Sequence, residues 1–153
     1  HLNTGHASGA LYTPLPPLSA GTLVIEFDWK PVPDRTYTGA FVNIRGKNPD
    51  RNVYYGRTNT PTKVTLRAYS YDNVRIELDN ASSDYLSPLV TELAHYRIEI
   101  DVRNQTIAFY VNGVLEQSYD GFIYAGELFF EFTFGGYSGN KFSFFDNVKI
   151  EVI

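Results

Sequence analysis

The stretch His95–Gly121, HYRIEIDVRNQTIAFYVNGVLEQSYDG, contains the clearest structural pattern in the chain. Apolar and polar side chains alternate along it with the two-residue period of strands that are buried on one face. The side chains expected to point inward are Ile98, Ile100 and Val102, then Ile107, Phe109 and Val111. Asn112-Gly113 readily adopts the positive φ angles of a two-residue hairpin turn, and Arg103-Asn104 marks an earlier turn. The segment therefore predicts a meander of three antiparallel strands.

Short strands separated by turn residues continue on both sides of this segment, as is typical of a β-sandwich. We expect strands at residues 9–15, 22–30, 38–45, 52–57, 63–69, 73–79, 96–102, 106–111, 114–119, 127–134 and 141–152. Pro14-Leu15-Pro16-Pro17 should end the first strand or confine it to a sheet edge. Residues 81–93 are the expected place for a helical turn, because Ser87-Pro88 can begin one.

The alternation also predicts the core and the domain organisation. Inward positions are expected at Ile25, Phe27, Val64, Leu66, Val74, Ile76, Leu78, Phe130, Phe132 and Phe134. Trp29 shares their parity, so it should lie in the core or at the rim of the sandwich. A chain of 153 residues suits one domain, 1–153, in which residues 1–8 form a flexible or extended amino-terminal segment. The aromatic content of 16% also favours an all-β fold.

Three segments resemble the concanavalin A-like jelly rolls, the superfamily of lectins, laminin-G domains and glucanases. HYRIEID followed by the hairpin FYVNGVL is similar to a recurrent element of that superfamily. GTLVIEFDWKP, from Gly21 to Pro31, resembles its early core strand, and FSFFDNVKIEV, from Phe142 to Val152, resembles its closing strand. The resemblance implies an all-β jelly-roll sandwich of two antiparallel sheets, most like a non-catalytic carbohydrate-binding module. Lectins, adhesion domains and enzymes share these strands, so the ligand stays open.

Composition excludes several classes of function. The net charge of −4 argues against a nucleic-acid partner, whose phosphates require a basic patch. The sequence has no run of 18 apolar residues, so we expect no membrane span. Cysteine is absent, which removes disulfides, thiolate catalysis and zinc-thiolate sites. We expect no required cofactor, and we assign no role to the three histidines.

The middle strands carry an unusual polar face, which is the main candidate for ligand binding. Its members are Asn43, Arg45, Arg57, Arg67, Tyr69, Arg75 and Glu77, and the nearby turns add Tyr71 and Tyr137. If the strands are neighbours, guanidinium and carboxylate groups can bind sugar hydroxyls while tyrosine rings stack on pyranose faces. The superfamily often uses such a concave face for glycans. The alternative is a solvated face with ordinary cross-strand ion pairs.

Asp146 interrupts the closing strand on the side shared by Phe142, Phe144, Val148 and Ile150. A carboxylate there requires a bulge, backbone N–H groups or a cation. Similar sugar-binding modules often hold a structural calcium ion near their terminal strands, but no D-x-D-x-D-G loop supplies a ligand set here. We prefer a hydrogen-bonded bulge, with a Ca²⁺ site as the alternative.

Glucanases of this fold place the acids of a retaining mechanism, which lie about 5 Å apart, in an E-x-D-x-E motif on one strand. Glu26-Phe-Asp28-Trp-Lys30 and Glu99-Ile-Asp101-Val-Arg103 each begin that motif and lack its last acid. We therefore expect no enzyme, although an acid pair from separate strands remains open.

The leading hypothesis is an extracellular module, secreted or at the cell surface, that binds a polysaccharide without altering it. The absence of methionine at position 1 agrees with a removed secretion signal or with a fragment of a larger protein. Other modules of such a protein, or further copies of this chain, are possible partners. The alternative is a structural surface, adhesion or filament subunit that makes protein–protein contacts through its Pro-rich amino-terminal segment, 1–18.

Overall fold

The computed structural model describes residues 2–3, 8–31, 38–46, 62–69, 72–78, 83–136 and 142–153. These ranges form strands joined by turns and loops, and they contain no helix. The strands are β1 (Leu2–Asn3), β2 (Ser8–Pro14), β3 (Thr22–Lys30), β4 (Thr38–Gly46), β5 (Thr62–Tyr69), β6 (Asn73–Leu78), β7 (Ser83–Leu89), β8 (Ala94–Asp101), β9 (Thr106–Val111), β10 (Val114–Asp120), β11 (Leu128–Gly136) and β12 (Phe142–Val152). No helix able to cross a bilayer occurs in this part of the chain.

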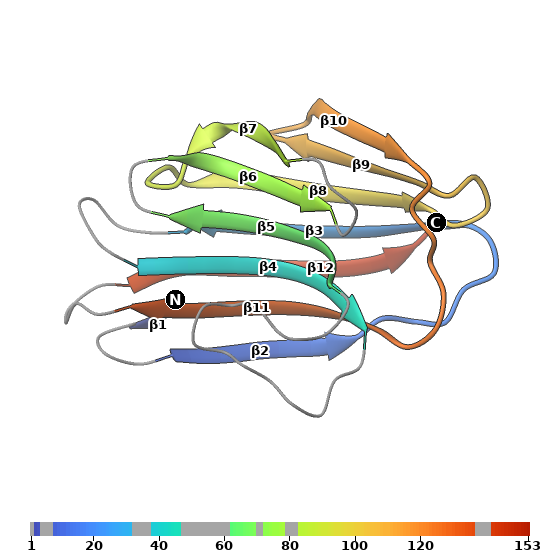
Figure 1. The fold of residues 1–153 in the computed structure, drawn as a ribbon, viewed down its shortest axis with the longest axis horizontal. Coiled ribbons are helices and arrows are strands. Elements are labelled where there is room, and N and C mark those ends of the chain that lie inside the picture. The colour runs from blue at the N-terminus through green and yellow to red at the C-terminus, as the bar shows by residue number, and fades with distance from the viewer. Residues whose placement is uncertain are drawn as a thin grey trace.

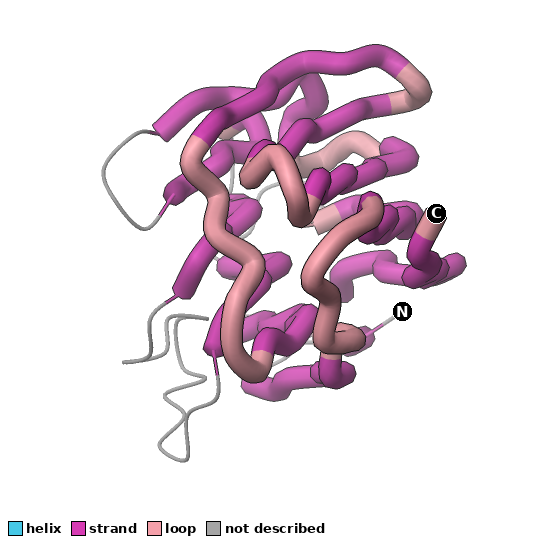
Figure 2. The backbone as a smooth tube through the Cα atoms, turned by 90° about the vertical axis from the view of Figure 1, so that its right-hand side faces the viewer, coloured by secondary structure: helices cyan, strands magenta, loops and turns pink. Residues whose placement is uncertain are grey.

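The strands form two antiparallel six-stranded sheets that pack face to face (Figure 1). The front sheet has the order β2-β11-β4-β5-β6-β7, and the back sheet has the order β1-β12-β3-β8-β9-β10. Figure 2 shows the two layers with the loops that cross between them at one end. Phe122 and Tyr124, in the loop from β10 to β11, are buried there, and the Tyr124 hydroxyl donates to the Pro16 carbonyl. This is the all-β jelly-roll sandwich that the sequence predicts.

The predicted meander is confirmed as β8, β9 and β10. Asn112 and Gly113 have φ angles of 48° and 82°, as the tight hairpin turn between β9 and β10 requires. The turn before it is longer than expected, with the left-handed residue at Gln105 (φ 57°). All six predicted inward positions are buried: Ile98 and Ile100 in β8, Val102 in the turn after it, and Ile107, Phe109 and Val111 in β9.

The core lies between the two sheets, where the predicted residues pack together. Ile25, Phe27, Val64, Leu66, Val74, Ile76, Phe130 and Phe132 are buried, and Leu78 is partly buried against them. Trp29 is fully buried, so it lies in the core, and its ring packs edge-on against Tyr96 and Phe132. The side chain of Phe134 lies outside the described residues.

The prediction of a helical turn within residues 81–93 is wrong, because the strand β7 occupies most of that range. Leu86, Pro88 and Val90 are buried and alternate with exposed side chains, which is the period of a strand. Proline is tolerated there because β7 is the last strand of the front sheet, and one side of an edge strand needs no N–H donor. Pro14 behaves as expected, since it ends β2 at the other edge.

Asp146 lies at the predicted bulge in β12. The pairing of β12 with β3 shifts register between Asp146 and Lys149, and Asn147 adopts φ 55°. The Asp146 carboxylate accepts the backbone N–H of Asn147 at 2.8 Å. The bulge makes Phe145 before it and Ile150 after it pack against the core, while Asp146 is exposed. The carboxylate is therefore solvated, which corrects the expectation that it shares the inward side of this strand.

Candidate functional site

The predicted polar face exists because β4, β5 and β6 are neighbours in the front sheet. In the register of these strands Asn43 lies opposite Thr65, and Arg67 lies opposite Arg75. Their sequence neighbours Val42, Ile44, Leu66 and Ile76 are core residues. Because side chains alternate along a strand, Asn43, Arg45, Arg67, Arg75 and Glu77 share the outer face of this sheet.

One half of this face is a buried polar cluster, formed by Arg45, Asn43, Thr65 and Glu131. The Nε of Arg45 lies 2.9 Å from Oε2 of Glu131, and the two side chains are only 2% and 0% exposed. Asn43 donates to Oε1 of the same carboxylate at 3.3 Å and accepts from the Thr65 hydroxyl at 2.8 Å. This buried cluster links β4, β5 and β11.

Aromatic rings flank the buried cluster. The guanidinium carbon of Arg45 is 5.7 Å from the ring centre of Tyr12 and 5.4 Å from that of Phe129. Such cation–π contacts strengthen when the cation is desolvated. Asn43 and Arg45 thus lie below the accessible surface, where they support the face. Direct contact of these two residues with a ligand stays a prediction.

The other half of the face is accessible and contains Arg67, Arg75, Glu77 and Tyr85, which we call the arginine face. Glu77 Oε1 accepts from Nη1 of Arg67 at 2.8 Å and from Nη2 of Arg75 at 3.1 Å. The guanidinium of Arg75 lies 6.0 Å from the ring centre of Tyr85, whose side chain is 55% exposed. Glu77 therefore holds both guanidinium groups in place, and these three charged side chains are 16–29% exposed beside the more exposed ring of Tyr85.

A small notch of about 10 Å³ opens in the arginine face. It is lined by Arg67, Asp72, Asn73, Arg75 and Tyr85. This volume holds about one water molecule, so the surface is shallow and suits contact along an extended ligand better than enclosure of a small one.

The remaining predicted ligand residues are not tested by the geometry. Tyr69 ends β5, but its side chain lies outside the described residues. Arg57, Tyr71 and Tyr137 lie outside them entirely. Sequence reasoning did not include Tyr85 among the ligand residues, because residues 81–93 were assigned to a helical turn. The apolar residues at every second position, Leu86, Pro88 and Val90, were the signal that this segment is a strand with Tyr85 on its outer face.

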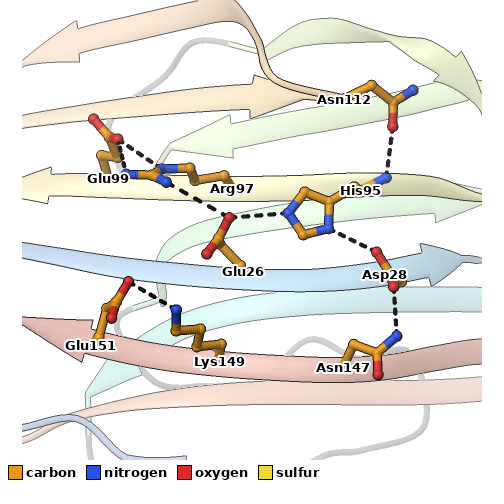
Figure 3. A network of polar contacts seen from close by, with 9 residues as sticks. All are labelled: Glu26, Asp28, His95, Arg97, Glu99, Asn112, Asn147, Lys149 and Glu151. Carbon is orange, nitrogen blue, oxygen red and sulfur yellow. Dashed lines mark hydrogen bonds and ion pairs between the residues drawn. The ribbon is translucent and has the colours of Figure 1, made fainter.

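The back sheet carries a second polar network on its own outer face, shown in Figure 3. His95 on β8 lies opposite Asp28 on β3, and its Nδ1 is 2.7 Å from the Asp28 carboxylate. Its Nε2 is 3.1 Å from Glu26 Oε1, which also lies 3.7 Å from Nη1 of Arg97. Asn147 donates to the second oxygen of Asp28 at 2.7 Å. The network joins β8, β3 and β12.

Protonated His95 donates from both ring nitrogens, and this predicts a pH dependence of stability. The hydrogen bonds to Asp28 and then to Glu26 raise the pKa of His95 above its ordinary 6.5. Its stabilising contribution is therefore complete below pH 6.5 and is lost as the pH rises through the raised value. Because His95 is 41% exposed, solvent screening limits the effect to about 0.3–1 kcal/mol.

Urea unfolding at pH 5.5, 7.0 and 8.5 checks this expectation. The His95→Gln variant should be less stable than the parent chain at pH 5.5 and should approach it at pH 8.5. The hydrogen bonds from Asn147 and then from His95 lower the pKa of Asp28, so Asp28 remains ionised across this window. A difference between the two chains that is constant with pH would contradict the ionic role of His95.

The two carboxylates of the polar face of the front sheet are not neighbours. Glu131 and Glu77 lie on β11 and β6, separated by β4 and β5. At about 4.8 Å per strand their backbones are about 14 Å apart, and each carboxylate is paired with arginine. Glu26 and Asp28 lie on the back sheet, where His95 contacts both. The described part of the chain has no group of three His, Cys, Asp or Glu residues able to hold a metal ion.

No protein-family model matches the chain, and no curated protein matches it by sequence. Its structure is similar to that of the carbohydrate recognition domain of Emp46p in a potassium-bound form. The TM-score is 0.73 at 10% identity, over 97% of this chain and 79% of that one. For the alginate lyase AlgAT5 of polysaccharide lyase family 7 the TM-score is 0.57 at 11% identity, and the match covers 87% of this chain and 60% of the lyase. For the β-glucanase of Bacillus licheniformis the TM-score is 0.54 at 13% identity, and the match covers 88% of this chain and 66% of the glucanase. At 10–13% identity these similarities show the fold alone, an all-β jelly-roll sandwich.

Proposed function

We propose that this concanavalin A-like jelly roll binds a polysaccharide non-catalytically on the arginine face of its front sheet. The observation that carries the proposal is the Arg67–Glu77–Arg75 array with the exposed ring of Tyr85 beside it. Ion pairs and a ring on one sheet face offer donors, an acceptor and a stacking surface at once.

The chemistry of the arginine face suits sugar hydroxyls. Glu77 holds both guanidinium groups in place, so little side-chain entropy is lost when a ligand binds. The buried cluster on β4, β5 and β11 fixes these adjoining strands through its own hydrogen bonds. A shallow, wet surface gains little free energy from contact with a ligand, and the glycan still loses freedom of motion when it binds. We therefore expect modest affinity and a preference for extended glycans.

The structural neighbours agree with this proposal, since they include lectin carbohydrate recognition domains and polysaccharide-degrading enzymes. A non-catalytic role is favoured because the described carboxylates are engaged by cations or lie on separate faces. We place the chain outside the cell, secreted or at the surface, as a module of a larger protein, because soluble and wall polysaccharides are available there. A structural Ca²⁺ near Asp146 remains an alternative for the bulge.

Replacing Arg75 by alanine is expected to weaken glycan binding at least tenfold. The change removes charge-assisted hydrogen bonds of about 1.5–3 kcal/mol and the support behind Tyr85. Arg67→Ala should act in the same direction. The measurement is a screen of purified chain against insoluble and soluble polysaccharides, with and without EDTA, followed by calorimetric titration with the glycan that is retained.

Arg97→Ala is the matched control for Arg75→Ala. Arg97 is 33% exposed and pairs with Glu99, two residues further along the strand. Arg75 is 29% exposed and pairs with Glu77 at the same spacing. The difference is that Arg97 lies on the back sheet. Binding should be unchanged in this control. Equal losses in both variants, or no loss in Arg67→Ala and Arg75→Ala, would exclude the arginine face. Retention of no polysaccharide at all would favour the structural-subunit alternative.

A further inference from the structure

β7 carries the exposed ring of the arginine face, but its own sheet holds only part of this strand. Among the described strands β7 pairs with β6 alone, since it is the last strand of the front sheet. Tyr85 lies opposite Arg75, and the register shifts between this pair and the next one, Leu89 with Asn73. Pro88 lies within the shifted part and has no backbone N–H to donate. The ladder of β7 is therefore interrupted beside Tyr85.

A second support comes from β10, the last strand of the back sheet, which lies beside β7 along the upper edge of the sandwich in Figure 1. Glu116 accepts the backbone N–H of Ser87 through Oε1 at 2.7 Å, and its Oε2 accepts the Ser87 hydroxyl. The Tyr119 hydroxyl donates to the Asp84 carboxylate. We call these the cross-sheet contacts. Because Asp84 and Ser87 lie on either side of Tyr85 in the sequence, the cross-sheet contacts flank the residue that carries the ring.

Both β10 residues are themselves held in place. Glu116 is the extra residue of a β-bulge, because the register of β10 with β9 shifts between Leu115 and Gln117. A bulge can turn a side chain out of the regular alternation, and here the carboxylate reaches the opposite sheet. Tyr119 is partly buried against the core, and its ring packs edge-on against Phe109. β10 thus presents one carboxylate and one hydroxyl to β7 from fixed positions.

We propose that Glu116 and Tyr119 are positioning residues for the arginine face, which fix β7 so that the ring of Tyr85 stays beside Arg75. This inference rests on the proposed glycan binding, and it makes affinity depend on contacts from the opposite sheet. The cation–π contact of Arg75 with Tyr85, at 6.0 Å on an exposed surface, is weak. When a cross-sheet contact is lost, a smaller fraction of molecules presents the ring, and the apparent affinity falls in proportion to that fraction.

The first measurement is hydrogen exchange of residues 83–89 in the full chain without ligand. Glu116→Ala removes both contacts to Ser87, so exchange in this range should become about fivefold faster, as expected for the loss of one net hydrogen bond. Glu116→Gln keeps an oxygen that accepts the Ser87 N–H, and it should restore parental exchange. The matched control is Asp101→Ala. Asp101 also accepts a backbone N–H and a side-chain donor, both from Asn104, but it lies at the far end of β8. Unchanged exchange in Glu116→Ala would overturn the proposal.

Affinity electrophoresis measures the effect on binding, with sodium alginate, β-glucan, xylan and galactomannan in separate gels. Glu116→Ala should weaken binding to the polymer that retards the parent chain about fivefold. Tyr119→Phe should do the same, because it removes the hydroxyl and keeps the ring against Phe109. Glu116→Gln and Asp101→Ala should bind as the parent chain does.

A Tyr85→Ala background distinguishes positioning from a general structural role. If Glu116 and Tyr119 act through the ring of Tyr85, Glu116→Ala and Tyr119→Phe should cause no further loss of affinity once that ring is absent. Losses of the same size in this background would overturn the proposal.

The gels also separate this inference from the proposed function. A parent chain that migrates unretarded in all four gels would contradict glycan binding, and the positioning role would fall with it. A parent chain that is retarded, with Glu116→Ala and Tyr119→Phe retarded equally, would leave glycan binding intact and overturn the positioning role alone.

Discussion

Replacing Glu131 with alanine is expected to lower the free energy of unfolding by about 3–5 kcal/mol, the loss typical of a broken buried ion pair. Glu131 is fully buried and accepts hydrogen bonds from Arg45 and Asn43. Without it, the Arg45 guanidinium stays buried with the rings of Tyr12 and Phe129 but lacks its carboxylate. Desolvation of that uncompensated charge is the main physical reason for the loss.

Equilibrium urea unfolding followed by circular dichroism measures this loss, with Glu77→Ala as the control. Glu77 also accepts from two arginines, but it is 25% exposed, so its removal should reduce stability by about 1 kcal/mol or less. The double variant Arg45→Met, Glu131→Leu should recover most of the loss, because an apolar pair leaves no buried charge. A loss as small for Glu131→Ala as for Glu77→Ala would contradict the buried cluster.

Alternation predicted the strands well wherever one face of a strand is apolar and the other polar. In β8 and β9 every inward position of the pattern is buried, and Asn112-Gly113 forms the turn between β9 and β10. The pattern failed in β7, where Pro88 was interpreted as the start of a helical turn. Proline has no hydrogen-bond penalty on the free side of an edge strand, and a sequence does not reveal which strand is at an edge.

The composition of the candidate site was harder to predict, because it depends on which strands are neighbours. Glu131 lies 88 residues from Asn43, and only the pairing of β11 with β4 brings them together. The same limit hid the contact of His95 with Asp28, since the two are 67 residues apart and meet through the register of β8 with β3. Long-range register is decided by packing of the whole sandwich, which the local two-residue period does not contain.

Side-chain parity also cannot distinguish an exposed outer face from a covered one. The period correctly put Asn43 and Arg45 on the same face as Arg67 and Arg75, yet the first pair is buried and the second is partly exposed. A bulge adds a second ambiguity, as in β12, where Phe145 rather than its even-numbered neighbours packs against the core. The more exposed part of the described face is therefore its half on β5, β6 and β7, and ligand contact of every residue of the predicted site stays a prediction.

Trp29→Ala is expected to reduce the free energy of unfolding by about 3–5 kcal/mol, because it leaves a large cavity in the core. Trp29 is fully buried, and its ring packs edge-on against Phe27, Tyr96 and Phe132. These four rings come from both sheets, so the cavity would open across the interface that holds the sandwich together. Complete burial also means that Trp29 gives no stacking surface for a sugar in this fold.

Trp29→Phe separates ring packing from hydrogen bonding at the same position. The indole Nε1 is buried and has no acceptor among the described residues, so its removal sacrifices no hydrogen bond. Phenylalanine keeps most of the ring contacts, and we expect a loss of about 1.5 kcal/mol or less. Urea unfolding of both variants, with polysaccharide titration of the phenylalanine variant, checks these values. A weakened glycan affinity in a Trp29→Phe chain of near-parental stability would show that Trp29 contributes to binding, whereas unchanged affinity would confine its role to the core.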